Sequence, residues 1–113
     1  MKKIISYDTE NDIFVIHKGF AKDEKFKGNI DAGELILDVS TKGKIKGIEI
    51  MNAINFLKEF EIDKNILSSI EDADFNALLQ PSGISLGITI KAKNIEHQIP
   101  AKITVPIDAP NCY

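Results

Sequence analysis

Two long runs of strictly alternating apolar and polar residues near the C-terminus constrain the fold more than any other feature of this sequence. Alternation with a period of two places successive side chains on opposite faces of a β-strand, so one face of each strand is apolar. The residues between the runs, 94–98, are few enough to join them as a β-hairpin. The apolar positions are Ile84, Leu86, Ile88, Ile90 and Ala92 in the first run and Ile99, Ala101, Ile103, Val105 and Ile107 in the second.

Two prolines in the second run, Pro100 and Pro106, indicate where this strand lies in its sheet. They are six positions apart, an even spacing, so both missing N–H groups would point to the same side of the strand. Proline inside a sheet is confined to edges and bulges. We therefore expect the last strand to be a sheet edge that pairs on its other side with residues 84–92.

Four more strands are predicted in the first half of the chain. Lys3–Tyr7 and Ile13–Ile16 flank a polar stretch that favours a turn, so they are expected to form a hairpin. Residues 35–40 alternate, turn at residues 41–44 and return as residues 45–51. These segments predict two antiparallel strand pairs.

Two stretches interrupt this regular pattern. Ile45 has the opposite parity to Ile48 and Ile50, and a β-bulge near Gly47 would bring all three to the same face. Residues 17–31 are rich in lysine and acidic residues and contain two glycines. We interpret this second stretch as a loop.

A short helical section is predicted between the fourth strand and the C-terminal hairpin. Asn52 is placed to cap a helix that runs through Phe60, and Asp63 to cap a second turn. Asp74 is expected to begin a third turn, which residues 81–83 would end. The apolar residues assigned to this third turn are Phe75, Leu78 and Leu79.

The predicted elements indicate an α+β fold with about six mainly antiparallel strands, in a single domain over residues 1–113. The short helical section is expected to pack on one face of the strands. One such section leaves apolar sheet surface uncovered, and surface of this kind is usually buried by a partner. A second copy of the chain is the expected partner, which predicts a homodimer.

The composition argues against several classes of function. All 14 basic residues are lysines and the net charge is −3, whereas arginine is the preferred reader of phosphates and guanine edges. We expect no specific binding of nucleic acid. No apolar run approaches the roughly 18 residues that span a bilayer or forms a secretory core, so no membrane association is expected. The one cysteine, Cys112, cannot form an internal disulfide, which favours the cytoplasm.

The first half of the chain combines several short motifs. Tyr7-Asp8 and Asp12 precede a strand, residues 31–38 end in an apolar strand, and a glycine-spaced run follows, Gly43-x-Ile45-x-Gly47-Ile48-Glu49-Ile50-x-Asn52-Ala53. The combination resembles the prokaryotic domain-of-unknown-function family twenty-two eighty-three over residues 4–57. The resemblance implies paired strands followed by a short helix, and no activity. Residues 58–113, with the helical section and the C-terminal hairpin, lie beyond it.

The candidate binding residues are acidic. Asp8, Glu10 and Asp12 alternate like the first ligands of a calcium loop, but the glycine and glutamate that an EF-hand needs at its sixth and twelfth positions are absent. An Asx-rich hairpin turn is the favoured interpretation. Glu49 stands on the strand face opposite Ile48, where it could be a buried or interface carboxylate with a perturbed pKa. An ordinary solvent-facing residue is the favoured interpretation.

Other constellations do not meet the requirements of their chemistry. Residues 83–87 match G-x-S-x-G, but Ser85 begins an alternating strand, and no acid lies between it and Glu96, just before His97. His17, His97 and Cys112 do not form the close pairs that zinc sites use. We predict no catalytic residues, no metal ligands and no cofactor.

These observations favour a non-enzymatic structural or protein-interaction domain, whose partner is a second copy of the chain or another protein. The alternative is a small-molecule or metal-ion binding domain that uses the Asp8–Asp12 turn or the face of Glu49. A hydrolase acting through Ser85 is a weaker hypothesis of a third class.

Overall fold

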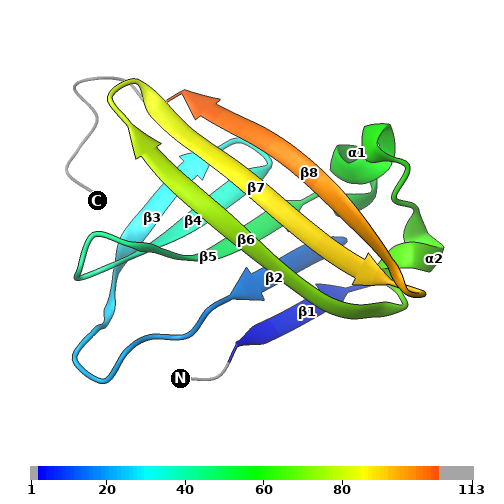
Figure 1. Ribbon diagram of the computed structural model, residues 1–113, viewed down its shortest axis with the longest axis horizontal. Coiled ribbons are helices and arrows are strands. Elements are labelled where there is room, and N and C mark those ends of the chain that lie inside the picture. Colours follow the sequence, from blue (N-terminus) through cyan, green and yellow to red (C-terminus); the bar gives the residue numbers. More distant parts are fainter. Residues whose placement is uncertain (1–2, 105–113) are drawn as a thin grey trace.

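Two antiparallel sheets make up most of the computed structural model, which describes residues 3–104 (Figure 1). The first sheet has the strand order β1-β2-β5-β4-β3, and the second has the order β6-β7-β8. In Figure 1 the second sheet crosses in front of the first. The strands are β1 (Ile4–Asp8), β2 (Ile13–His17), β3 (Phe26–Ala32), β4 (Leu35–Ser40), β5 (Ile45–Met51), β6 (Ile70–Gln80), β7 (Gly83–Ala92) and β8 (Ile95–Thr104).

Three short helical segments connect the sheets: α1 (Ala53–Leu57), the 3₁₀ helix η1 (Lys58–Phe60) and α2 (Lys64–Leu67). The predicted cap at Asp63 is confirmed, because its side chain accepts a hydrogen bond from the Ile66 N–H at 2.9 Å. The predicted cap at Asn52 is wrong: its backbone is left-handed, with φ 50°, and its side chain makes no capping bond. No helix within residues 3–104 is long and apolar enough to cross a membrane.

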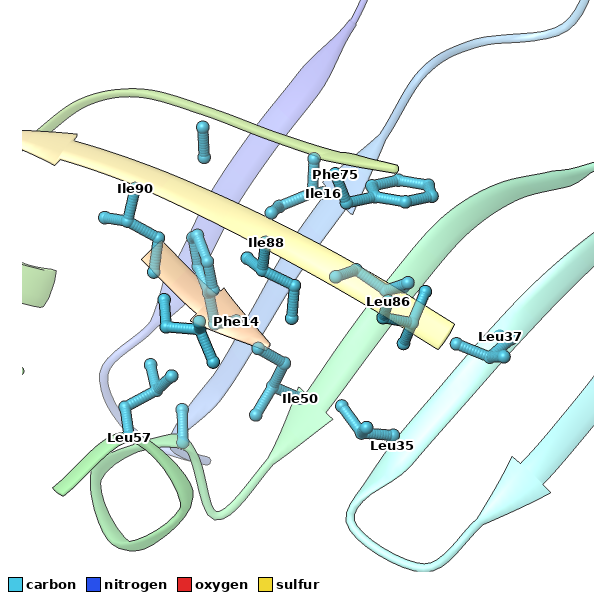
Figure 2. Packing of buried hydrophobic residues seen from close by; sticks show 14 of the residues in the cluster. Phe14, Ile16, Leu35, Leu37, Ile50, Leu57, Phe75, Leu86, Ile88 and Ile90 are labelled. Carbon is cyan, nitrogen blue, oxygen red and sulfur yellow. The ribbon is translucent and has the colours of Figure 1, made fainter. Parts of the chain in front are cut away.

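The hydrophobic core lies between the two sheets (Figure 2). The first sheet contributes inward side chains mainly from β2, β4 and β5, and the second sheet contributes them from all three of its strands, with the largest number from β7. Burial of such side chains stabilises the fold by about 1.5–3 kcal/mol each, so this layer holds the sheets together. The fully buried members include Phe14, Ile16, Leu37, Ile48, Ile50, Phe75, Ile88 and Ile90.

The α+β expectation holds broadly, but residues 3–104 contain eight strands rather than about six. One missed strand is β3, which lies within the stretch interpreted as a loop; only residues 18–25 connect β2 to it. Its inward positions are Gly28, Ile30 and Ala32, and only Ile30 is a large apolar residue. Two small residues leave almost no alternation in hydropathy, so the pairing of β3 with β4 could not be read from the pattern.

The other missed strand is β6, where a third helical turn was expected. Phe75, Leu78 and Leu79 have helical spacing, but β6 pairs with β7 along almost its whole length. Phe75 is buried, whereas Leu78 and Leu79 are 61% and 47% exposed. The helical spacing was therefore coincidental. The alternation that forms the strand comes from Ala73, Phe75 and Ala77, and alanine made it weak.

The C-terminal hairpin is confirmed, with a tighter turn than expected. Ile88 lies opposite Ile99, and Ile84 lies opposite Ile103. The turn consists of Lys93 and Asn94, whose φ angles of 52° and 64° are those of a two-residue primed turn. β8 is the edge of its sheet, as its proline predicted: Pro100 is exposed there. Val105, Pro106 and Ile107 lie outside the described residues.

The predicted bulge near Gly47 is also confirmed. Asp38 on β4 pairs with Gly47, but the next residue, Val39, pairs with Ile45 and skips Lys46. The extra residue lets Ile45 face the core together with Ile48 and Ile50, all of which are buried.

Candidate functional site

In the polar turn between β1 and β2, the first carboxylate, that of Asp8, accepts hydrogen bonds from other residues of the turn. Asp8 accepts hydrogen bonds from the backbone N–H groups of Glu10 (3.0 Å) and Asn11 (3.1 Å) and from the Asn11 side-chain amide (2.9 Å). These bonds, led by that of the Asn11 side chain, lower the pKa of Asp8. Glu10 is exposed. The turn therefore has the Asx-rich geometry that the sequence favoured over a calcium loop.

The last residue of this turn, Asp12, caps helix α1 from a distance of 42 positions along the chain. Its carboxylate accepts from the Ile54 N–H at 3.1 and 3.2 Å, and its backbone oxygen accepts from the Ala53 N–H at 3.0 Å. The Tyr7 hydroxyl donates to the same carboxylate at 2.7 Å. Burial, and then this bond, raise the pKa of Tyr7 to about 12. Asp12 thus connects the β1–β2 hairpin to α1 and provides the helix cap that was predicted for Asn52.

The outer face of the first sheet, which points away from the second sheet, is the other candidate site. Strand register places its outward positions in three rows across the sheet. We call this surface the Glu49 face. Its rows are Asp8, Ile13, Met51 and Glu34; Ser6, Val15, Glu49, Ile36 and Asp31; and Ile4, His17, Gly47, Asp38 and Asn29.

Glu49 occupies the middle of this face on the central strand β5. Its direct neighbours across the strands are Val15 on β2 and Ile36 on β4. Burial raises the pKa of Glu49, and the nearby negative charge of Asp38 raises it further. No described lysine forms an ion pair with Glu49. It is therefore a half-buried carboxylate without an ion-pair partner among residues 3–104.

Next to Glu49, Gly47 provides the space in which two side chains converge. A Cβ atom at Gly47 would lie 2.5 Å from Cδ2 of His17 and 2.8 Å from Oδ2 of Asp38. His17 Nε2 lies 3.9 Å from that same Asp38 oxygen, while its Nδ1 accepts the Gly19 N–H at 2.8 Å. Burial raises the pKa of Asp38, and His17 partly offsets the rise. Sequence reasoning missed this histidine–aspartate pair. The one feature of the sequence that could have indicated it is Gly47, a glycine inside strand β5 that leaves room for the side chains of the two neighbouring strands.

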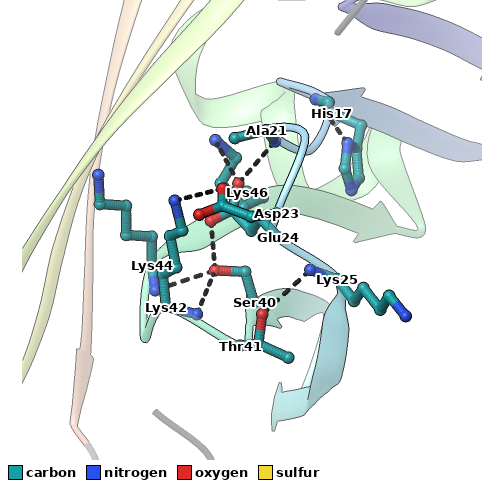
Figure 3. A network of polar contacts seen from close by, with 11 residues as sticks. His17, Ala21, Asp23, Glu24, Lys25, Ser40, Thr41, Lys42, Lys44 and Lys46 are labelled. Atoms are coloured by element: carbon teal, nitrogen blue, oxygen red, sulfur yellow. Dashed lines mark hydrogen bonds and ion pairs between the residues drawn. The ribbon is translucent and has the colours of Figure 1, made fainter.

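An ion network around the buried Glu24 fixes the β2–β3 loop, residues 18–25, against β4 and β5 (Figure 3). Glu24 accepts from the Ala21 N–H at 2.9 Å and from the Ser40 hydroxyl at 2.6 Å, and it pairs with Lys46 at 3.3 Å. These contacts, the Ala21 bond first, lower the pKa of Glu24 to about 2. Lys42 pairs with Asp23 at 2.7 Å.

The network also pairs two lysines, Lys42 and Lys46, with carboxylates of the loop. Their charges are thereby compensated within the domain, and they do not make a free phosphate-binding patch. The loop also places Phe20 edge-on against the His17 ring, with centroids 4.9 Å apart.

Comparison with known proteins bears on the same half of the chain. Residues 4–53 match the family model described as "Protein of unknown function (DUF2283)". The resemblance expected for the N-terminal half is confirmed. The DUF2283 segment contains β1–β5 and the first residue of α1, so every position of the Glu49 face lies within it.

One curated relative is similar over a longer stretch than the DUF2283 segment. The "Uncharacterized protein MJ0789" of Methanocaldococcus jannaschii is 39% identical over 64 residues, which are 57% of this chain and 50% of the relative. The chain thus spans about half the length of that relative. No solved structure matches the chain.

The geometry also bears on the metal and hydrolase hypotheses. Within residues 3–104, no group of three histidine, cysteine, aspartate or glutamate side chains is placed to hold a metal ion. Ser85 lies inside β7, and its hydroxyl donates to the Gln80 side chain at 3.1 Å. The strand continues to Ala92, so Ser85 does not stand at the strand-to-helix turn that a nucleophile elbow requires.

Proposed function

We propose that this domain is a non-enzymatic protein-interaction module that binds its partner through the Glu49 face. The observation that carries the proposal is Glu49 itself, half-buried between Val15 and Ile36 with no described cation beside it. Partial burial of a carboxylate costs free energy unless a cation or hydrogen-bond donors compensate it. A partner that supplies such a group would turn this cost into binding energy.

The apolar residues around Glu49 support the same proposal. Ile13, Val15, Ile36 and Met51 all face outward from the sheet and are only half-buried. The second sheet covers the opposite, inner face of β1–β5, so these side chains have no covering layer among residues 3–104. A contiguous apolar patch rimmed by polar residues is typical of a protein interface.

The alternative, a ligand or metal site at the Asp8–Asp12 turn, has less support. The carboxylates of Asp8 and Asp12 already accept hydrogen bonds from the turn, from Tyr7 and from α1. A cation would have to displace these bonds, which contribute to the fold. We therefore place the interaction on the sheet face. We also propose a cytoplasmic location, on the ground that the one cysteine, Cys112, cannot form a disulfide within the chain.

Homodimer formation stays a prediction, but its basis has changed. The apolar surface that suggested it is now largely accounted for by sheet-on-sheet packing. A two-fold dimer through the Glu49 face would set its carboxylates against each other. Leu78, which is 61% exposed on the outer side of β6 near the β6–β7 turn, is the better candidate for a dimer contact. Light scattering of the wild type and of a Leu78→Ser variant tests this, with a monomeric wild type contradicting it.

Photo-crosslinking tests the proposed function. A photoreactive amino acid replaces Ile36 on the Glu49 face or, as the matched control, Glu96, an exposed residue of β8 at the end of the second sheet away from Leu78. Each protein is irradiated in extract of the cells that produce it. We expect a discrete crosslinked product from position 36 and none from position 96. Equal products from both positions, or none from position 36, would refute the proposal.

A further inference from the structure

The charges of the Glu49 face are almost all of one sign. Its three rows contain the carboxylates of five residues, a single histidine and no lysine. The nearest lysine along β5, Lys46, is held by Glu24 at 3.3 Å. The five acidic positions are Asp8, Asp31, Glu34, Asp38 and Glu49.

The apolar and acidic positions are also interleaved. Val15 and Ile36 lie directly across from Glu49, and opposite residues in antiparallel strands have Cβ atoms about 4.5–5.5 Å apart. Any group that reaches Glu49 therefore also contacts apolar side chains. A small hydrated cation would neutralise the charge of Glu49 but would leave the apolar side chains around it exposed to water.

Resting on the proposed function, we infer that the partner is a protein segment that presents lysine or arginine among apolar residues, such as a basic amphipathic helix. Its cation pairs with Glu49, and its apolar side chains cover Val15 and Ile36. Asp38 and the other carboxylates of the face steer the approach of a positive segment.

Two other occupants fit this surface less well. A second copy of the chain docked through the same face would bring its five carboxylates against an identical set, with no lysine in the three rows to compensate them. A nucleic acid would meet the same repulsion, because its backbone is anionic. The charge pattern therefore selects a basic protein segment.

Three labelled peptides of equal length serve as probes. The first is an amphipathic helix of leucine and lysine, the second carries glutamate in place of every lysine, and the third carries serine in place of every leucine. Binding to the full chain is measured by fluorescence anisotropy at about 150 mM salt, where distant charges are screened. The chains compared are the wild type, Glu49→Gln and Glu59→Gln, the last being an exposed glutamate on η1 with the same change in net charge.

We expect the leucine–lysine peptide alone to bind the wild type measurably. Glu49→Gln should weaken this binding about tenfold or more, as for other close charge pairs at interfaces, while Glu59→Gln leaves it unchanged. Equal loss in both variants, tight binding of the serine–lysine peptide or no binding of any peptide would overturn the inference.

The failure of this inference can be distinguished from that of the proposed function. If the leucine–glutamate peptide binds as tightly as the leucine–lysine peptide, the inference that the partner is positively charged is wrong. A position-specific crosslink from Ile36 would still support docking on this face. Absence of that crosslink refutes the proposed function whatever the peptides do.

Discussion

The outer faces of the two sheets differ sharply, although their inner faces share one core. On the second sheet the outward side chains are mostly polar and bond to each other: the Thr89 hydroxyl donates to the Gln98 side chain at 3.0 Å, and Ser85 to Gln80 at 3.1 Å. On the first sheet Glu49 lies at the centre of its outward row, and it and its apolar neighbours Val15 and Ile36 are half-buried.

This difference separates the roles of the two halves. The second sheet supplies a cover for the core, and its exposed side resembles that of any solvated antiparallel sheet. The first sheet is covered on the same inner side but keeps a desolvated carboxylate and apolar neighbours on the outer one. The DUF2283 match covers only this first sheet, so the candidate interaction surface and the family motifs coincide.

The largest effects are expected where both sheets meet. Ile88→Ala in β7 and Ile48→Ala in β5 each remove a fully buried side chain and should cost about 2–5 kcal/mol of unfolding free energy. Thr89→Ala and Lys102→Ala, on the outer side of the second sheet, should cost no more than about 0.5 kcal/mol. Urea denaturation measures all four. Comparable losses for Thr89→Ala and Ile88→Ala would show that the outer side of the second sheet is also buried.

The hairpin on which this prediction depends is also the part that the sequence specified best. Strict alternation at residues 84–92 predicted that this segment is a strand, which of its faces is buried and which segment pairs with it. Pro100 correctly indicated that β8 is the edge of the sheet. β3 and β6 were missed because Gly28, Ala32, Ala73 and Ala77 occupy inward positions. Such small residues carry little periodic signal.

A pair of strand glycines gives the next effect in size. Gly47→Ala places a Cβ atom within 2.8 Å of both His17 and Asp38, so it should cost about 1–3 kcal/mol through overpacking. Gly87→Ala in β7 meets no atom within 4 Å and should change stability by less than about 0.5 kcal/mol, which makes it the matched control. Thermal unfolding compares the two, and equal effects would contradict the convergence described at Gly47.

Tyr7→Phe tests the hydrogen bond that holds the Asp12 carboxylate, which in turn caps α1. Loss of a hydrogen bond to the Asp12 carboxylate should cost about 1.5 kcal/mol, because bonds to charged groups are stronger than neutral ones. Thr89→Val removes an exposed bond of the second sheet and should cost less than about 0.5 kcal/mol. Chemical denaturation measures both variants, and a Tyr7→Phe protein as stable as the wild type would show that the Tyr7–Asp12 bond does not stabilise the fold.

That capping pair also shows the limit of sequence reasoning about the candidate site. Asp12 and Ile54 are far apart in sequence, so a local rule assigned the cap to Asn52 instead. Glu49 was recognised because it interrupts an apolar strand, but His17 and Asp38 were not placed near it. Their proximity depends on the strand order β2-β5-β4, which no local pattern contains.

The smallest expected effect concerns Glu49 and depends on pH. Its folded-state pKa lies above the ordinary value of 4.5, so its ionised form destabilises the fold. Glu49→Gln should therefore gain about 0.5 kcal/mol near pH 7, a typical surface effect, and the gain should vanish as the pH falls below 4.5. A variant that is less stable than the wild type near pH 7 would show that Glu49 has a stabilising partner.

Glu24 provides the opposite case for the same experiment. Its folded-state pKa of about 2 lies below 4.5, so its contribution is fully present above pH 4.5 and is lost as the pH falls towards 2. Glu24→Gln should be less stable than the wild type near pH 7, and this difference should shrink in acid. Urea midpoints measured across the pH range follow both glutamates. A Glu24→Gln protein as stable as the wild type near pH 7 would contradict the buried network.

Methyl NMR of the native chain, titrated with extract of the cells that produce it, tests the central claim most directly because it reports on both sheets at once. If the Glu49 face is the interaction surface, the methyl signals of Ile13, Val15 and Ile36 should shift or broaden. Ile95 and Leu78, exposed on the second sheet, should stay unchanged in the same spectra. Changes confined to Ile95 and Leu78, with the three face residues unaffected, would contradict the account.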